Sequence, residues 1–262
     1  MMSRCPLALD TMHLNRQVRA TYERVARAPA SGFHFHTGAQ YAVRQLGYDA
    51  AELAALPPAC TERFSGIGNP LRIGTIPAGA VVLDHACGAG MDLLLAAKLV
   101  GPEGRAIGVD LTPGMRACAL RAAAQAGLLD RIRVFEGTFE DLPMDDASVD
   151  VVISNGVLNL APDKPRVLCE IARVLKPGGR LFLADVVLDR ELAPGVRGNA
   201  DLWASCIGGA VTEPLLMALL DECGLREARV IERFECFAGT DIDRKFHAHL
   251  HAYGVNVLAS RR

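Results

Sequence analysis

The chain has 262 residues, 50% of them hydrophobic, and its 28 basic and 30 acidic side chains give a formal net charge of -2. This size allows one large α/β domain with an extension, or two small domains, and the near-zero charge excludes a global field that recruits nucleic acid or anionic lipid. We therefore expect a small molecule as the partner, and neither nucleic acid nor a membrane.

Residues 1–75 show helical and loop patterns without a regular alternation of strands and helices. "NRQVRATYERVARA" has helical periodicity, whereas "SGFHFHTG" and "RFSGIGNPLRIG" are loops punctuated by glycine. The N-terminal stretch lacks an apolar run of signal-peptide length, and no segment approaches the ~20 apolar residues of a membrane helix. We predict a helical cap or lid over 1–75 and a cytoplasmic location.

From residue 80 onward, short β-branched runs alternate with longer amphipathic stretches. The expected strands are 80–86, 106–110, 131–137, 149–156 and 179–188, and the expected helices are 91–100, 114–127 and 164–179, the last closed by Pro-Gly-Gly. Asp163 is placed to cap that last helix, with Lys164 near solvent. This alternation predicts a parallel sheet with helices on both faces, whose ligands bind at the carboxyl ends of the strands.

A predicted insertion at about 190–212 contains the segment "DLWASCIGGA". A helix at 213–223 follows, and two strands at 226–237 and 251–260 are expected to close the sheet as an antiparallel pair. The sequence therefore predicts a seven-stranded, Rossmann-like α/β domain over 76–262, with the N-terminal cap packed on it.

The strand-to-helix turn "VLDHACGAGMDLLLAA" carries the strongest local signal. Asp84 ends a strand, and Gly88 and Gly90 let the backbone approach a ligand at the start of the next helix. A dinucleotide fingerprint needs a third glycine at the position of Leu93, which disfavours a pyrophosphate. Asp110, 20 residues after Gly90, ends the next strand and is placed to accept ribose hydroxyls. Two strand-end carboxylates suit a ligand with an amine at one end and a ribose in its middle.

The motif series "VLDHACGAG", Asp110, "EGTFEDLPMDDASVDVVISNGVLN" and "RVLKPGGRLFLAD" resembles that of class I S-adenosylmethionine-dependent methyltransferases over roughly residues 80–188. The resemblance implies S-adenosylmethionine as cofactor, with its methionine part beside Asp84 and the glycine turn, its ribose on Asp110 and its adenine near Glu140. The positions that it assigns to the cofactor are Asp84, Cys87, Gly88, Gly90, Asp110, Leu111, Thr138, Phe139 and Ser154. His85 departs from the family pattern, and we expect it to have a structural role.

The flanking segments "QVRATYERVA", "ERFSGIGNPL", "SNGVLNLAPDK" and "DLWASCIGGAV" resemble arsenite methyltransferases over roughly residues 17–212. In that family cysteine thiolates hold trivalent arsenic, and one of the three cysteines matches Cys206. The other two fall on Ile67 and Gly156, so the three-thiolate site does not carry over. We expect a small soft acceptor, arsenite or a related metalloid first, and a thiol, sulfide or selenium compound next.

Three residues are the candidates for the reaction itself. Cys206 either contacts the acceptor or packs; Asn155 ends the fourth strand, where the methyl donor faces the acceptor. His36, with His34 two positions earlier, is the candidate base for a carbon or oxygen acceptor of the quinone type, which stays open. A protein that only senses the cofactor stays open too, as does a homodimer.

The remaining cysteines and histidines show no metal-ligand spacing, so no metal site is expected. Cys87, Cys118, Cys169 and Cys223 are expected to be structural, Cys60 is placed near the mouth of the site, and the histidines at 247–251 are expected to face solvent or a partner.

Overall fold

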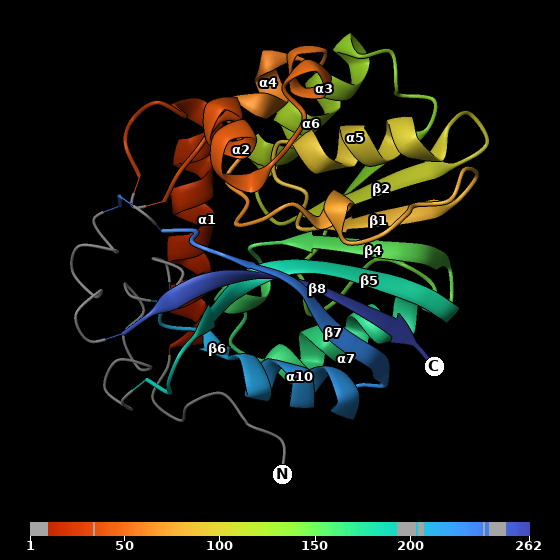
Figure 1. Ribbon diagram of the computed structural model, residues 1–262. Helices are drawn as coiled ribbons and strands as arrows, with labels where there is room; N and C mark the ends of the chain where they lie inside the picture. The colour runs from red at the N-terminus through yellow and green to blue at the C-terminus, as the bar shows by residue number, and fades with distance from the viewer. Residues whose placement is uncertain (1–9, 34, 193–202, 204–206, 238, 241–249) are drawn as a thin grey trace.

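The computed structural model describes residues 10–33, 35–192, 203, 207–237, 239–240 and 250–262 (Figure 1). Its centre is an eight-stranded sheet in which seven strands follow the order β3-β2-β1-β4-β5-β8-β7. The strands are β1 Val81–His85, β2 Arg105–Asp110, β3 Ile132–Glu136, β4 Val149–Asn155, β5 Leu175–Leu188, β6 Val211–Thr212, β7 Leu225–Phe234 and β8 Ala252–Arg261. The seven predicted strands are all present, and the additional β6 is a two-residue strand on β5.

Strands β1 to β5 pair in parallel, whereas β8 runs antiparallel to β5 and β7 antiparallel to β8. The domain helices are α5 Met91–Val100, α6 Pro113–Gln125, α7 Lys164–Val174 and α10 Glu213–Glu222, with short 3-10 helices η1 Pro70–Arg72 and η2 Leu158–Leu160. Figure 1 shows α5 and α6 on one face of the sheet and α7 and α10 on the other. This is the doubly covered α/β arrangement that the sequence predicts.

Both faces of the sheet are apolar because side chains alternate along each strand. Val82 and Val151 pack in one core cluster with Ala96 and Val100 of α5. Their neighbours in sequence, Leu83 and Val152, lie in a second cluster, together with apolar side chains of α7 and α10. Burial on both faces accounts for continuous Val, Ile and Leu runs instead of polar alternation.

The predicted helix at 164–179 was too long, because α7 ends at Val174 and β5 begins at Leu175. Pro177 lacks the N–H that a continuing helix needs, and Gly178 adopts a φ of +76°. The Lys-Pro-Gly-Gly stretch therefore forms an irregular start of β5, where the register against β4 shifts between Val149 and Val151.

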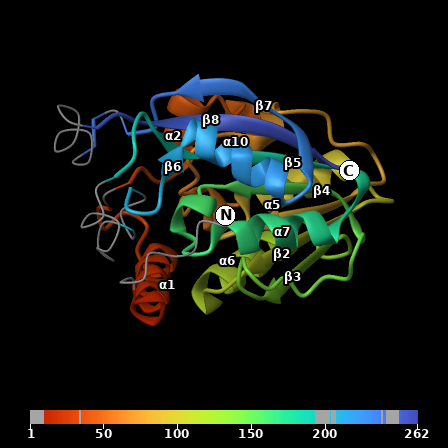
Figure 2. The ribbon, with the colours of Figure 1, turned by 90° about the horizontal axis from the view of Figure 1, so that it is seen from below.

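The N-terminal segment contributes α1 Thr11–Arg27, α2 Ala39–Leu46, α3 Ala50–Ala54 and α4 Pro58–Thr61. Asp10 caps α1 by accepting a hydrogen bond from the N–H of His13 at 2.9 Å. Apolar residues of α1 to α4 share one core cluster with α5 and α6, so the cap is packed onto the domain. Figures 1 and 2 place α1 beside the carboxyl ends of the parallel strands.

Within the described residues, no helix has the length and apolar character needed to cross a membrane. Most of the predicted insertion at 190–212, including residues 193–202 and 204–206, lies outside the described part of the chain.

Candidate functional site

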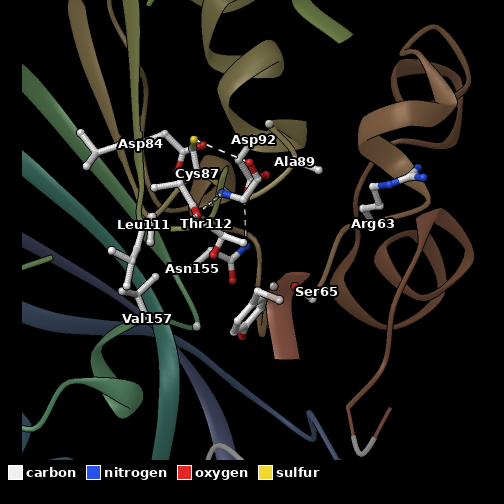
Figure 3. A pocket seen from close by; sticks show the side chains of 18 of the residues that line it. Arg63, Ser65, Asp84, Cys87, Ala89, Asp92, Leu111, Thr112, Asn155 and Val157 are labelled. Atoms are coloured by element: carbon white, nitrogen blue, oxygen red, sulfur yellow. Dashed lines mark hydrogen bonds between the residues drawn. The ribbon is translucent and has the colours of Figure 1, made fainter. Parts of the chain in front are cut away.

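A cavity opens at the carboxyl ends of β1, β2 and β4, beneath α1 and the loop at residues 63–66 (Figure 3). The space between its atoms amounts to about 910 Å³, part of it open to solvent. Strand ends contribute Asp84, Asp110 and Asn155 to its wall, and the cap contributes Val18 and Tyr22.

The glycine turn after β1 shapes one wall of this cavity. A Cβ added at Gly88 would meet no atom within 4 Å, so the backbone there faces open space. A Cβ at Gly90 would lie 3.0 Å from the Cβ of Ala119, so glycine lets α5 start close against α6. Ala86 adopts a φ of +60°, an unusual conformation for a residue with a side chain. The turn is therefore built for close approach of a ligand to its backbone.

Asp84 and Asp110 are both buried, at 3% and 8% exposure. Asp110 accepts hydrogen bonds from Thr112 N at 2.7 Å and Gly88 N at 2.9 Å, which tie it to the glycine turn. Asp84 Oδ2 has no hydrogen-bond partner within the described residues. Burial, followed by the charges of Asp92 and Asp110, raises the pKa of Asp84 well above its usual range.

A third buried carboxylate, Asp92 in the first turn of α5, is 6% exposed. Tyr48 OH donates to its Oδ1 at 2.6 Å, and Asn155 Nδ2 donates to its Oδ2 at 2.9 Å. Burial raises the pKa of Asp92 to about 6, although both hydrogen bonds lower it. The buried, unpartnered oxygen of Asp84 and the two neighbouring acids, Asp92 and Asp110, would be stabilised by a positive charge and by N–H donors. The residues present therefore fit a cationic ligand that carries an amine.

Both polar atoms of the Asn155 side-chain amide form hydrogen bonds. Its Oδ1 accepts from Ile67 N at 2.8 Å and Gly68 N at 3.0 Å, and its Nδ2 also donates to Gly68 O at 2.9 Å. The side chain thus joins the end of β4 to the 66–68 loop and to Asp92. We predicted Asn155 at the reaction centre; it lines the cavity, and its bonds give it the contacts of a positioning residue.

The prediction of a structural role for His85 agrees with its contacts. Its Nδ1 lies 3.2 Å from Ser154 Oγ and its Nε2 lies 3.2 Å from Phe139 O. Burial lowers the pKa of His85 to about 4, so the ring is neutral at pH 7. It ties β1 to β4 and to the segment containing Phe139 beneath the turn. Ser154, predicted at the cofactor, is 1% exposed and directed to His85.

Of the other predicted cofactor residues, Cys87, Leu111 and Phe139 line the cavity together with Gly88 and Gly90. Thr138 is not among the lining residues and forms an isolated bridge with Asp141. Glu140 is half-buried next to them, and burial raises its pKa.

Of the predicted catalytic residues, His36 lies away from the cavity and Cys206 lies outside the described residues, as does His34. His36 stacks on Tyr41 of α2, with ring centroids 4.6 Å apart, and does not line the cavity. Cys60 does line it; its Sγ donates to Pro57 O at 3.1 Å, and burial raises its pKa to about 12. Cys60 is therefore a neutral thiol at pH 7.

Ile67 and Gly156, the two positions where the resemblance predicts missing cysteines, are in contact. A Cβ at Gly156 would lie 2.8 Å from Ile67 Cγ1, and Gly156 has a φ of +73°. Ile67 is 3% exposed and belongs to an apolar cluster with Leu160 and Ile207. Gly156 lines the cavity together with Val157 and Leu160, and the buried Ile67 packs against Gly156.

Tyr48 and Asp92 are site residues that the sequence pattern did not predict. Asp92 carried a signal, because it is an acid in the first turn of the helix after a glycine turn. Tyr48 carried none, since only folding brings it to Asp92, 44 positions away. Within the described residues, no group of three or more His, Cys, Asp or Glu side chains is arranged to hold a metal ion.

Comparisons with known proteins agree with this geometry. A family model described as a methyltransferase domain matches residues 76–227. An arsenite methyltransferase of Halobacterium salinarum is 39% identical over 209 residues, 79% of this chain and 53% of its own length. One from Aquipseudomonas alcaligenes is 37% identical over 186 residues, 69% of this chain and 53% of its own length.

The crystal structure of an arsenic (III) S-adenosylmethionine methyltransferase from Chlamydomonas reinhardtii is similar, with a TM-score of 0.70 and 35% identity. The match covers 79% of this chain and 71% of that one. The chain spans about half the length of the two curated arsenite methyltransferases that it matches.

Proposed function

The chain belongs to the class I S-adenosylmethionine-dependent methyltransferases, and on that basis we propose that it transfers a methyl group to a small soft nucleophile, with trivalent arsenic as the first candidate. S-adenosylmethionine, when bound, supplies an electrophilic methyl group on a positively charged sulfur. Everything else in the reaction has to come from the residues around the cavity and from the acceptor.

Binding of the cofactor is assigned to the strand-end acids and the glycine turn. Asp84, with its unpartnered oxygen, would accept from the amine of the methionine part, and Gly88 offers open backbone beside it. Asp110 retains free lone pairs beyond its bonds to Thr112 and Gly88, so it can accept from ribose hydroxyls. Three buried carboxylates also favour a cation over a neutral ligand.

The observation that carries the acceptor class is the chemistry of the cavity wall. The described lining residues include no histidine, and both oxygens of Asp92, the lining acid with a pKa of about 6, are held by Tyr48 and Asn155. Beside Gly156 the wall is formed by Val157 and Leu160, and Arg19, Arg63 and Ser65 of the cap line the cavity as well. An oxygen or carbon acceptor must lose a proton, whereas a soft atom with a lone pair attacks the methyl group without a base. Positioning in a dry pocket then supplies most of the catalysis.

We propose that the acceptor brings most of its own sulfur ligands. Gly156 in the cavity wall and Ile67, which packs against it, offer no sulfur, and the cavity thiols of Cys60 and Cys87 are buried groups with raised pKa. Trivalent arsenic prefers thiolates, so arsenite carrying small thiols such as glutathione fits an apolar wall better than free arsenite does. Cys206 is the proposed protein ligand, and its role remains a prediction.

The test is transfer of a labelled methyl group from S-adenosylmethionine to arsenite, selenite, sulfide, small thiols and quinols, each with and without glutathione. We expect turnover with arsenite that depends on glutathione and falls at least tenfold in Cys206→Ser. Cys118→Ser, which changes a buried cysteine of α6, is the matched control and should retain activity. Turnover with quinols alone would reject the soft-acceptor proposal.

We also propose a cellular compartment and a class of partner. Scattered cysteines without a paired framework fit the reducing cytoplasm that we propose, with a small-molecule acceptor and no nucleic acid or membrane partner. A homodimer stays a prediction for size measurements in solution.

A further inference from the structure

The carboxylate of Glu23 in α1 reaches the N-terminus of α6 and caps it. Its Oε1 accepts a hydrogen bond from Gly114 N at 2.9 Å. Pro113 is the first residue of α6 and has no N–H, and the N-cap residue Thr112 forms no side-chain capping hydrogen bond to the helix. Gly114 therefore carries one of the N–H groups that a helix leaves unpaired at its start, and a residue 91 positions away supplies the acceptor. A negative carboxylate is also favoured at this end of the helix dipole.

The contact at Glu23 requires glycine at position 114, because α1 and α6 approach each other closely. A Cβ at Gly114 would lie 2.6 Å from Glu23 Oε2 and 3.0 Å from the Cβ of Ala26. Ala26 and its neighbour Val25 are buried in one apolar cluster with Met115 of α6. Figure 2 shows α1 lying next to α6. The hydrogen bond and the apolar contacts together fix the position of α1 on the domain.

The capped end of α6 borders the cavity on two sides. Tyr22, the residue before Glu23, lines the cavity from α1. Thr112 N, two positions before Gly114, donates to Asp110 Oδ1 at 2.7 Å. Asp110 is the acid assigned above to the ribose. Glu23 therefore joins the helix that covers the cavity to the turn between β2 and α6 that carries Asp110.

We propose that Glu23 is a positioning residue for S-adenosylmethionine: by capping α6 it holds α1 over the cavity and fixes the turn of Asp110. The inference rests on the cofactor site proposed above, and Glu23 itself is not among the residues that line the cavity. When the cap is removed, α1 occupies its binding position for a smaller fraction of the time. The apparent affinity for the cofactor then falls in proportion to that fraction.

Trp203 reports the position of α1 independently of cofactor binding. It is the only tryptophan in the chain, it is 3% exposed, and it packs with Leu14 and Val18 of α1. Displacement of α1 exposes the indole ring to water and shifts its fluorescence emission to longer wavelength. The emission therefore separates movement of α1 from damage to the contacts of the cofactor.

The test compares Glu23→Ala with the unchanged chain by calorimetric titration with S-adenosylmethionine and by Trp203 emission. We expect Glu23→Ala to bind the cofactor about fivefold more weakly, the ratio that corresponds to loss of a typical helix cap. Its emission without cofactor should lie at longer wavelength, and saturating cofactor should restore it. Glu23→Gln keeps an oxygen that accepts from Gly114 N, so its affinity should stay within about twofold of the unchanged chain. Gly114→Ala displaces α1 from the other side of the contact, so its loss of affinity should not add to that of Glu23→Ala.

Arg27→Ala is the matched control, because Arg27 pairs with Glu23 at 3.7 Å on the exposed side of α1 and does not line the cavity. It should change neither the affinity nor the emission. Circular dichroism and urea unfolding check that each variant is folded. An unchanged affinity in Glu23→Ala, an equal loss in Glu23→Gln, or a loss without a shift in emission would overturn the positioning role. Absence of cofactor binding by the unchanged chain would instead reject the cofactor site, and this inference with it.

Discussion

The contact between Ile67 and Gly156 predicts that a cysteine at either position alone is costly, whereas the two together are partly compensating. Gly156→Cys places a Cβ 2.8 Å from Ile67 Cγ1 at a φ of +73°. The left-handed backbone costs about 1 kcal/mol, and overpacking costs about 2 kcal/mol more. Ile67→Cys removes buried carbons and costs about 2 kcal/mol by itself.

In the double variant the smaller side chain at position 67 makes room for the new sulfur. The double-mutant cycle should therefore show favourable coupling of about 1 to 2 kcal/mol in the free energy of unfolding. Urea unfolding followed by circular dichroism measures it. Gly79→Cys is the matched control, because Gly79 has a φ of +79° with no atom within 4 Å of its added Cβ. It should cost about 1 kcal/mol and show no coupling to Ile67→Cys.

The double variant also places a sulfur in the cavity wall at position 156 and a second sulfur next to it at position 67. We expect it to bind arsenite in the absence of glutathione at least tenfold more tightly than either single variant. Additive unfolding free energies, within about 0.5 kcal/mol, would refute the packing argument. Equal arsenite binding by all variants would refute the assignment of this wall to the acceptor.

Three further predictions concern charge and close packing. Because the pKa of Asp92 is about 6 and a cation favours its ionised form, affinity for S-adenosylmethionine should fall as pH drops from 8 to 5. Calorimetry should find a smaller fall in Asp92→Asn, in which Asp84, whose pKa is also raised, still titrates. Burial lowers the pKa of His85 from 6.5 to about 4, so the unfolded chain binds a proton at this residue at a higher pH than the folded chain does. The free energy of unfolding should therefore decline by up to about 3 kcal/mol as pH falls from 6.5 to 4. Urea titrations of His85→Gln should lack that decline. Gly209→Ala makes the new Cβ clash with Asn159 O and should destabilise the fold by about 3 kcal/mol or more in thermal unfolding. Gly127→Ala, in open space, should cost about 1 kcal/mol, and equal effects of the two variants would contradict the packing.

Local pattern was sufficient for most of the sheet. The β-branched runs ending at His85, Asp110 and Asn155 form strands because short continuous apolar runs suit strands that are buried on both faces of a parallel sheet. The local pattern gave the wrong end for the predicted helix at 164–179, because Pro177 cannot continue the helix that the preceding residues favour. It also failed at Lys164, predicted near solvent but 7% exposed, with Nζ on Ala161 O at 2.8 Å and 4.8 Å from the Trp203 ring centroid.

The site was predictable only as far as it follows from strand ends. Asp84 and Asp110 were found because the carboxyl ends of adjacent parallel strands meet at one edge. The bonds of Asn155 to Ile67 and Gly68 join positions 88 and 87 apart in sequence, and no local pattern encodes such contacts. Asp163 was predicted as a cap, and it accepts from Arg166 N at 3.1 Å, because capping is a local interaction.

Calorimetric titration with S-adenosylmethionine tests most directly the claim that the acidic cavity is the cofactor site. We predict one molecule bound per chain, with affinity reduced at least tenfold in Asp84→Asn, since that oxygen is unpartnered within the described residues and a charged hydrogen bond contributes about 1.5 to 3 kcal/mol. Absence of binding heat at millimolar cofactor, or an affinity unchanged in Asp84→Asn, would contradict the account.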